Sequence, residues 1–455
     1  MKNILFINPP NIPFTSKGIL IEPIDIIHLA TFTKSLGYNV SFLDMDVKKI
    51  HPEFIHDFVD LNKIDIAVIV FDYHIPLHDE GTNQNIKKLL TILNDFKITS
   101  ILGGKIASYY NEEKLKDWNA DFFIHKEMET PLKNILSDLS SLPNNIRKKD
   151  KNTNIIISSD YKKNIINLND FPFPDRSLCD LSDYIDVRTM LSSRGCNLKC
   201  TFCHVPEFWG NWNGKSPELV VQEIDYLKKE FNTKKILFLD DNATAQPKRM
   251  KEISQLLIAQ NNQTPLGCLG TIISFQEDVM QKMFNAGFRW IHYGVESGDM
   301  QQLHLMNKKI TPEKTQYVLS KTKEIGFRIR TSWIMDMPDL TEEALFNTEK
   351  MILNNPTDEI RLHFLTLRLG SFLHNKFHID TKQFIHNHKQ NLNISGLDSQ
   401  LISASVERII SSLLQKGYVL VSNPDDFLDV EKLKRQSPEL KIVSLCPLRY
   451  GLGWS

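Results

Sequence analysis

The sequence predicts an α/β protein with two parallel-sheet domains in series, and three observations support this. Short apolar runs alternate with amphipathic stretches from residue 1 to about 150, the same alternation returns from about 187, and a polar segment separates them. At 455 residues the chain exceeds the roughly 250 to 300 residues at which single cores stop growing. We expect a first domain at 1–140, a linker at 141–180, a core at 181–370 and a C-terminal extension at 371–455.

The first domain is expected to be a doubly wound, Rossmann-like sheet. Its strands are predicted at 3–7, 39–43, 65–71, 98–102 and 122–124, with helices at about 24–36, 52–61, 84–96 and 112–117. Ligands of such sheets bind beyond the carboxyl ends of the strands. The segments that directly follow strands are therefore the candidate binding loops.

A polar stretch at 139–170, rich in Ser, Asn, Asp and Lys, predicts a linker with one hairpin. Six strands follow, predicted at 187–192, 235–239, 267–272, 289–294, 327–335 and 359–366, and a helical stretch comes after each of the first five. Ser216-Pro217 and Thr311-Pro312 are typical helix starts, and Gly326 ends the second of these helices. Six such units predict a partial (β/α)6, TIM-type barrel with its site at the carboxyl ends of the strands.

A cysteine run, SSRGCNLKCTFCH, follows the first barrel strand. The thiolates of Cys196, Cys200 and Cys203 would hold three corners of a [4Fe–4S] cluster and leave the fourth iron open. A Cys3His zinc site with His204 is an alternative, although His204 directly follows Cys203 and would strain a tetrahedron. Disulfides are disfavoured by six cysteines in a chain with no secretory segment.

The Cys-x3-Cys-x2-Cys run resembles the cluster loop of the radical S-adenosylmethionine (SAM) superfamily. The resemblance implies that SAM chelates the open iron and is reductively cleaved to a 5'-deoxyadenosyl radical. It also implies a flavodoxin- or ferredoxin-type electron donor. Phe202 matches an aromatic residue that packs near the adenine in this family, with ordinary loop packing as the alternative.

Further polar groups at strand ends resemble SAM-binding motifs. FLDDN places Asp240 and Asp241 after the second barrel strand, and YGVESG places Glu296 and Ser297 after the fourth. Carboxylates suit a ribose diol or an ammonium group because they accept several hydrogen bonds at once. A helix or turn cap is the alternative for Asp240.

Two arginines, Arg328 and Arg330, share one face of the fifth barrel strand because side chains alternate along a strand. If that face is the barrel interior, Arg330 is a candidate to bind SAM or a substrate carboxylate. If it faces a helix, both arginines are partners of acidic side chains. The sequence leaves both readings open.

The pieces FINPP, ILGGK and HKEMET at the first, fourth and fifth strand ends resemble the cobalamin-binding domain that precedes the radical SAM core in one subfamily. Gly103 and Gly104 would let the backbone approach a flat macrocycle, with a plain turn as the alternative. Lys126 stands where the subfamily usually has glycine. The resemblance implies cobalamin contacts by Pro10, Asn11, Phe71, Asp72, Tyr73, Gly103, Gly104, Lys126 and Glu127.

Histidines are not expected to bind cobalt or another metal. The loop after the first strand, NPPNIPFTSKG, has no histidine, and His74 and His78 lie outside the Asp-x-His-x-x-Gly pattern of cobalt-ligating loops. The tail histidines His374, His378, His386 and His388 match no metal spacing. Cys446 is a candidate for metal binding or radical chemistry, with a buried thiol as the more common alternative.

The charge and hydropathy of the chain limit the classes of partner that we expect. Lys and Arg total 54 against 55 for Asp and Glu, which predicts neither a nucleic acid nor a membrane partner. Without a membrane-length apolar run or a signal peptide, we expect a cytoplasmic enzyme with a small-molecule or peptide substrate. The predicted function is a cobalamin-dependent radical SAM methyltransferase acting on an unactivated carbon or on phosphorus. The alternatives are rearrangement, ring contraction or cyclisation without methyl transfer, and a non-catalytic cobalamin or redox sensor with a structural cluster.

Overall fold

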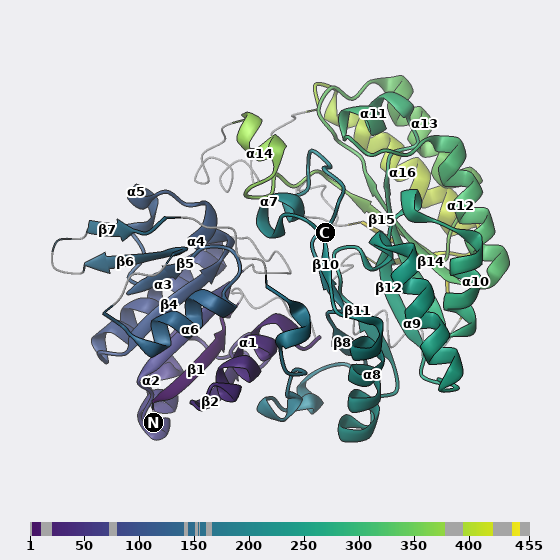
Figure 1. Ribbon diagram of the computed structural model, residues 1–455. Coiled ribbons are helices and arrows are strands. Elements are labelled where there is room, and N and C mark those ends of the chain that lie inside the picture. Colours follow the sequence, from purple (N-terminus) through teal and green to yellow (C-terminus); the bar gives the residue numbers. More distant parts are fainter. Residues whose placement is uncertain are drawn as a thin grey trace. The chain divides into compact units, whose positions relative to one another are not determined.

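The computed structural model divides the chain into two compact units, Met1–Ile185 and Asp186–Ser455 (Figure 1). The residues that the structure describes are 2–10, 21–71, 80–140, 144–150, 153, 155–160, 166–377, 395–421 and 439–445. Several residues singled out in the sequence lie outside these ranges: Asn11, Asp72, Tyr73, His74, His78, His378, His386, His388 and Cys446.

The first unit is built on a seven-stranded sheet in the order β2-β1-β3-β4-β5-β6-β7. Its first five strands are parallel and confirm the predicted doubly wound sheet. The hairpin β6–β7 adds to β5 in antiparallel fashion, and it comes from the segment predicted to be a linker. The strands are β1 (Asn3–Asn8), β2 (Asn39–Asp44), β3 (Ile66–Phe71), β4 (Thr99–Gly104), β5 (Phe122–Ile124), β6 (Ile146–Asp150) and β7 (Ile155–Ser158).

Helices connect these strands, and most of them were predicted. The central strand β3, IAVIVF, is buried along its whole length, as expected for a parallel strand covered on both faces. Two short helices, α4 and α6, were not predicted. The helices are α1 (Ile24–Ser35), α2 (Ile55–Asn62), α3 (Glu80–Asp95), α4 (Lys105–Tyr109), α5 (Glu112–Leu115) and α6 (Glu129–Ser137).

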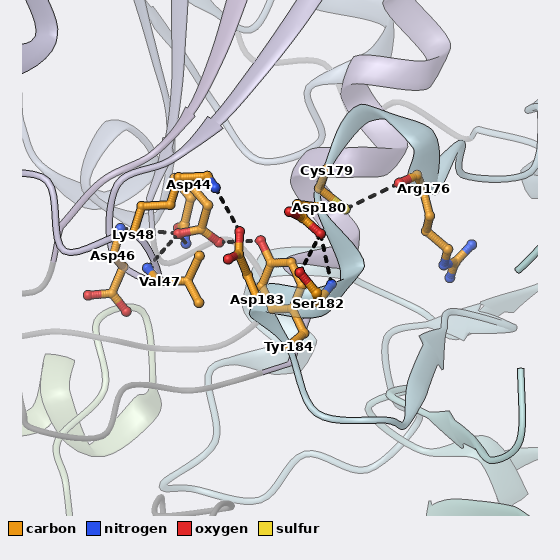
Figure 2. Close-up of polar contacts among 11 residues, drawn as sticks. Asp44, Asp46, Val47, Lys48, Arg176, Cys179, Asp180, Ser182, Asp183 and Tyr184 are labelled. Carbon is orange, nitrogen blue, oxygen red and sulfur yellow. Dashed lines mark hydrogen bonds and ion pairs between the residues drawn. The ribbon is translucent and has the colours of Figure 1, made fainter.

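The proline-rich connector after residue 170 is bonded to the first unit (Figure 2). The Tyr184 hydroxyl donates to Asp44 Oδ2 at 2.8 Å, and Lys48 pairs with Asp183 at 2.8 Å. Upstream, Arg176 pairs with Glu22 at 3.3 Å, and both side chains are fully buried. The connector therefore belongs to the core of this unit up to Tyr184.

The second unit is an eight-stranded parallel sheet in the order β16-β17-β15-β14-β13-β12-β11-β8. The six predicted barrel strands are confirmed, while β16 and β17 come from the tail and extend the sheet beyond β15. The strands are β8 (Arg188–Met190), β11 (Ile236–Phe238), β12 (Leu266–Gly270), β13 (Phe288–Glu296), β14 (Arg328–Ile334), β15 (Glu359–His363), β16 (Val419–Val421) and β17 (Ile442–Leu445).

Amphipathic helices cover the outer side of this sheet (Figure 1). They are α8 (Pro217–Phe231), α9 (Pro247–Ala259), α10 (Glu277–Asn285), α12 (Pro312–Ile325), α13 (Glu342–Asn354) and α16 (Ser399–Gln415). The predicted caps are confirmed: Ser216 accepts from Leu219 N, Thr311 from Lys314 N, and Gly326 ends α12 with φ +108°. Within the described ranges, no helix has both the length and the apolar composition that a membrane crossing requires.

Candidate active site

The cysteine loop begins directly beyond the carboxyl end of β8. Its first residues form β9 (Ser193–Arg194), which pairs with β10 (Asn213–Gly214), and the short helix α7 (Val205–Trp209) lies between them. Gly195 has φ +81°, and a Cβ there would lie 2.8 Å from the Asn211 carbonyl oxygen. Only glycine therefore fits at the turn that presents Cys196.

Three consecutive side chains after β11 bind successive positions of this loop. Asp240 accepts hydrogen bonds from Ser192 N at 2.7 Å, Ser192 Oγ at 2.6 Å and Ser193 Oγ at 2.5 Å. Asp241 Oδ2 accepts from Gly195 N at 2.9 Å, and Asn242 Nδ2 donates to Cys196 Sγ at 3.5 Å. The FLDDN motif thus fixes the first half of the loop from the neighbouring strand end.

These contacts differ from the SAM contacts predicted for Asp240 and Asp241. Asp240 is 0% exposed and both of its oxygens are engaged by serines of the loop, so its described contacts make it a buried anchor of the loop, while the SAM contacts of Asp240 and Asp241 stay predictions. Burial raises the pKa of its carboxyl group, opposed by the serine bonds and by Arg249. Arg249 in turn donates to Ser192 O at 2.8 Å and so holds the same residue from its carbonyl side.

The second half of the loop is held by segments that follow β13 and β15. Thr201 N donates to Met306 O at 3.0 Å, and Asn307 Nδ2 donates to Lys199 O at 2.6 Å. Leu373 N, at the start of α14 (Phe372–Phe377), donates to Thr201 O at 3.0 Å. Both ends of the cysteine run are therefore held by hydrogen bonds to the backbone of the loop, which constrains where the thiols lie.

The three thiols have the properties that a cluster site requires. Cys196, Cys200 and Cys203 are partly buried free thiols. Burial raises the pKa of Cys200, and it raises that of Cys203 to about 12, so without metal these thiols keep their protons, which ligation of a metal would have to displace. In the described part of the chain, no group of three or more His, Cys, Asp or Glu side chains is placed to hold one metal ion. In a four-iron cube each of the three thiolates would bind a separate iron.

Glu296, one of the predicted SAM residues, ends β13 in a strained conformation. Its φ is +73°, and the register with β14 shifts between Gly294 and Glu296. Lys308 Nζ lies 3.6 Å from Glu296 Oε1 and donates to Gly294 O at 2.6 Å. Burial raises the pKa of Glu296, and Lys308 opposes that rise. Sequence reasoning missed Lys308, which no motif marks, and this lysine holds the carboxylate at the carboxyl end of the barrel.

Ser297 is placed differently from Glu296. Its hydroxyl lies 3.0 Å from Thr348 Oγ1 of α13 and accepts from Asp299 N at 3.1 Å. The side chain is buried, so its described contacts tie the end of β13 to a covering helix. The direct SAM contact predicted for Ser297 has no support in these bonds.

Arg330 lies on the interior face of the sheet, which resolves the alternatives that the sequence left open. Ile329 and Trp333 pack in the core with the helices, so Arg330 faces the opposite side. It forms an ion pair with Glu359 of β15, and its guanidinium lies 4.7 Å from the Trp290 ring. Arg330 is thus paired with a carboxylate of the neighbouring strand, and its predicted binding of SAM or a substrate carboxylate stays a prediction.

Phe202 packs at the barrel end in an apolar cluster with partly buried Phe377. This contact agrees with the ordinary packing alternative, and the adenine contact stays a prediction. The buried members of the cluster are Met306, Ile334, Met337, Leu365, Leu367 and Leu373.

In the first unit, the predicted glycine pair has a packing explanation. A Cβ on Gly103 would lie 2.1 Å from the Met128 sulfur, and one on Gly104, whose φ is +104°, would lie 1.7 Å from Phe71 O. The space beside Gly103 is filled by the Met128 side chain, and the macrocycle contact of the two glycines stays a prediction. Lys126 has φ +56°, so it keeps the left-handed backbone expected of the glycine that it replaces.

The remaining described cobalamin candidates lie near the strand ends, as predicted. Pro10 and Phe71 are buried, and Glu127 is half-buried. Their ligand contacts stay a prediction.

Comparisons with known proteins agree with this geometry. Residues 190–352 match the model of the radical SAM superfamily, which implies a [4Fe–4S] cluster and SAM. An uncharacterized methyltransferase of Pyrococcus horikoshii is 24% identical over 76% of this chain and 77% of its own length.

Two solved structures share the fold. The cobalamin-dependent SAM radical enzyme OxsB with aqua-cobalamin has a TM-score of 0.67 and 19% identity over 85% of this chain. The radical SAM methyltransferase TsrM of Kitasatospora setae, with cobalamin and a [4Fe–4S] cluster, has a TM-score of 0.66 and 13% identity, covering 86% of this chain and 75% of its own. The chain spans only 56% of OxsB.

Proposed function

Because residues 190–352 are a radical SAM domain, we propose that this protein is a cobalamin-dependent radical SAM methyltransferase. Its substrate would be a small molecule or peptide, methylated at an unactivated carbon or at phosphorus. The observation that carries the proposal is the pairing, in one chain, of a β2-β1-β3-β4-β5 parallel sheet with the cysteine-loop barrel. The fold likeness to OxsB and TsrM extends over both parts and supports this reading.

The residues of the chain have distinct roles in this proposal. When bound, the cluster supplies an electron for SAM cleavage, and cobalamin serves as a methyl carrier. Cys196, Cys200 and Cys203 would hold the cluster on the clamped loop. Glu296, oriented by Lys308, would accept hydrogen bonds from the SAM ribose at the carboxyl end of β13.

Anaerobic reconstitution tests the cluster first. We expect about four irons and four sulfides per chain. The Cys200→Ala variant should not cleave SAM, because one corner of the cluster loses its ligand. The matched control is Cys179→Ala, which removes a half-buried thiol of the first unit and should leave cleavage unchanged. Stoichiometric zinc without iron in the wild type would contradict the proposal.

Cobalamin and methyl transfer need separate measurements. After incubation with hydroxocobalamin and gel filtration, the absorbance spectrum should show bound corrinoid. With SAM that carries a deuterated methyl group, product mass spectrometry counts transferred methyl groups. Corrinoid binding with no labelled methyl in the product would favour rearrangement or cyclisation. SAM that stays intact with a reduced cluster would favour a sensor.

A further inference from the structure

Cys196 differs from a plain cluster ligand because two N–H groups point at its sulfur. Leu198 N and Asn242 Nδ2 each lie 3.5 Å from Cys196 Sγ. The backbone donor comes from the loop itself and is fixed by the loop path. The amide donor comes from the segment that follows β11, and it is a side chain, so its presence depends on the residue type at position 242.

The orientation of the Asn242 amide is set by a hydrogen bond from Thr244 to its oxygen. Thr244 Oγ1 donates to Asn242 Oδ1 at 3.3 Å, which directs the NH2 end of the amide towards the sulfur. Thr244 Oγ1 itself accepts from Thr271 N at 3.0 Å and lies 2.8 Å from Ser274 Oγ, and either hydroxyl of that pair can be the donor. This chain of hydrogen bonds links the carboxyl ends of β11 and β12 to the cysteine loop.

The Asn242 and Thr244 side chains are shielded from water. Asn242 is 3% exposed and Thr244 is 6% exposed, so little water competes for these bonds. A buried amide is costly unless its groups are paired, and this one is paired at both ends. Filling the space at position 242 would not require a polar residue. The hydrogen bond to Cys196 explains why an amide occupies this position.

We propose that Asn242 is a positioning residue that raises the reduction potential of the cluster held by Cys196. A hydrogen bond to a thiolate stabilises negative charge, and the cluster carries one more negative charge after it accepts an electron. The bond therefore favours the reduced state that SAM cleavage needs. This inference rests on the proposed function only in requiring that the three cysteines hold a cluster.

A redox titration without SAM tests the proposal independently of activity. Asn242→Leu keeps the side-chain size and removes the donor. At a fixed potential, we expect the ratio of reduced to oxidised cluster to fall by up to about tenfold, or ~59 mV for one electron. Thr244→Val, which leaves Asn242 in place but unoriented, should shift the ratio in the same direction by less. Electron paramagnetic resonance of the reduced cluster gives the readout.

The control removes the hydrogen bond that a different asparagine, Asn307, donates to the same cysteine loop. Asn307→Gly deletes the bond to Lys199 O without strain, because Asn307 has φ +55°. It should leave the potential unchanged even if it lowers cluster content. An Asn242→Leu protein with full iron content and the wild-type potential would overturn the proposal.

If the Asn242→Leu variant binds no cluster, the redox titration of the Thr244→Val variant tests the proposal instead. A wild-type reduction potential in Thr244→Val would then overturn the proposal. A wild-type chain that binds no iron would instead refute the proposed function. The two failures are thus separated by the iron analysis of the wild type.

Discussion

Asp241 Oδ2 accepts the Gly195 amide hydrogen at 2.9 Å, and this bond joins the end of β11 to the turn that presents Cys196. Asp240 and Asn242, on either side of Asp241, bind the same loop. The acidic motif after β11 therefore acts on the proposed cluster through the shape of its loop. Four expected outcomes follow from this and from the contacts of the first unit.

Asp241 should matter for cluster retention more than for SAM affinity. Asp241→Ala removes the acceptor of the Gly195 amide, and we expect iron to be lost about 10- to 100-fold more readily to a chelator. Asp241→Asn keeps a carbonyl oxygen at that place and should retain most of the iron. Normal iron retention combined with lost SAM binding in Asp241→Ala would instead support the direct ligand role that the sequence suggested.

Gly195→Ala should prevent cluster assembly. Both the positive φ of +81° and the 2.8 Å approach to Asn211 O oppose a Cβ at this turn. Gly417 is the matched control, because its φ is +83° but a Cβ there would meet nothing within 4 Å. Gly417→Ala should cost only about 1 kcal/mol of unfolding free energy and leave the iron content intact. Equal iron content in both variants would contradict this account of the turn.

Lys126→Gly should stabilise the first unit by roughly 0.5–1 kcal/mol, because glycine adopts φ +56° without the strain of a side chain. Lys133 is the control, since it lies exposed within α6. Lys133→Gly should destabilise by about 1 kcal/mol through the poor helix propensity of glycine. Urea unfolding curves measure both changes. Destabilisation in both variants would show that the Lys126 side chain makes contacts worth more than the backbone strain.

The stability of the first unit should depend on pH through Asp44. Burial raises the pKa of this carboxyl group from 3.8 to about 6, against hydrogen bonds from Val47, Tyr184 and Asn8. Because the folded pKa is the higher one, the folded state binds the proton more tightly than the unfolded state. The resulting stability, of the order of 2–3 kcal/mol, is fully present below about pH 4 and is lost as the pH rises through about 6.

Calorimetry of the full chain between about pH 4 and 7 tests this expectation. Asp44→Asn should remove this part of the pH dependence while keeping a bond to the Tyr184 hydroxyl (Figure 2). A variant with the same pH slope as the wild type would place the titrating group elsewhere.

The sequence by itself determined the five parallel strands of the first sheet and six of the eight strands of the second, because apolar periodicity and caps such as Ser216 and Thr311 act over a few neighbouring residues. The spacing of Cys196, Cys200 and Cys203 likewise placed the centre of the chemistry before any coordinates. The roles of the polar residues were decided only by the tertiary structure. Asp240 and Arg330 resemble ligand-binding residues in sequence. In the structure, Asp240 bonds Ser192 at the end of another strand, and Arg330 pairs with Glu359 on the neighbouring strand.

The same reason explains Lys308 and Met128, which no local pattern marks. Lys308 reaches Glu296 from beyond the helix Met300–Leu305, and Met128 fills the space beside Gly103 from a different strand end. A polar side chain or a glycine can contact a ligand, or it can stabilise the fold through contacts with other residues. Which of these roles it has depends on the residues that pack against it. That information lies in contacts between segments far apart in the chain, and only the folded sheet brings those segments together.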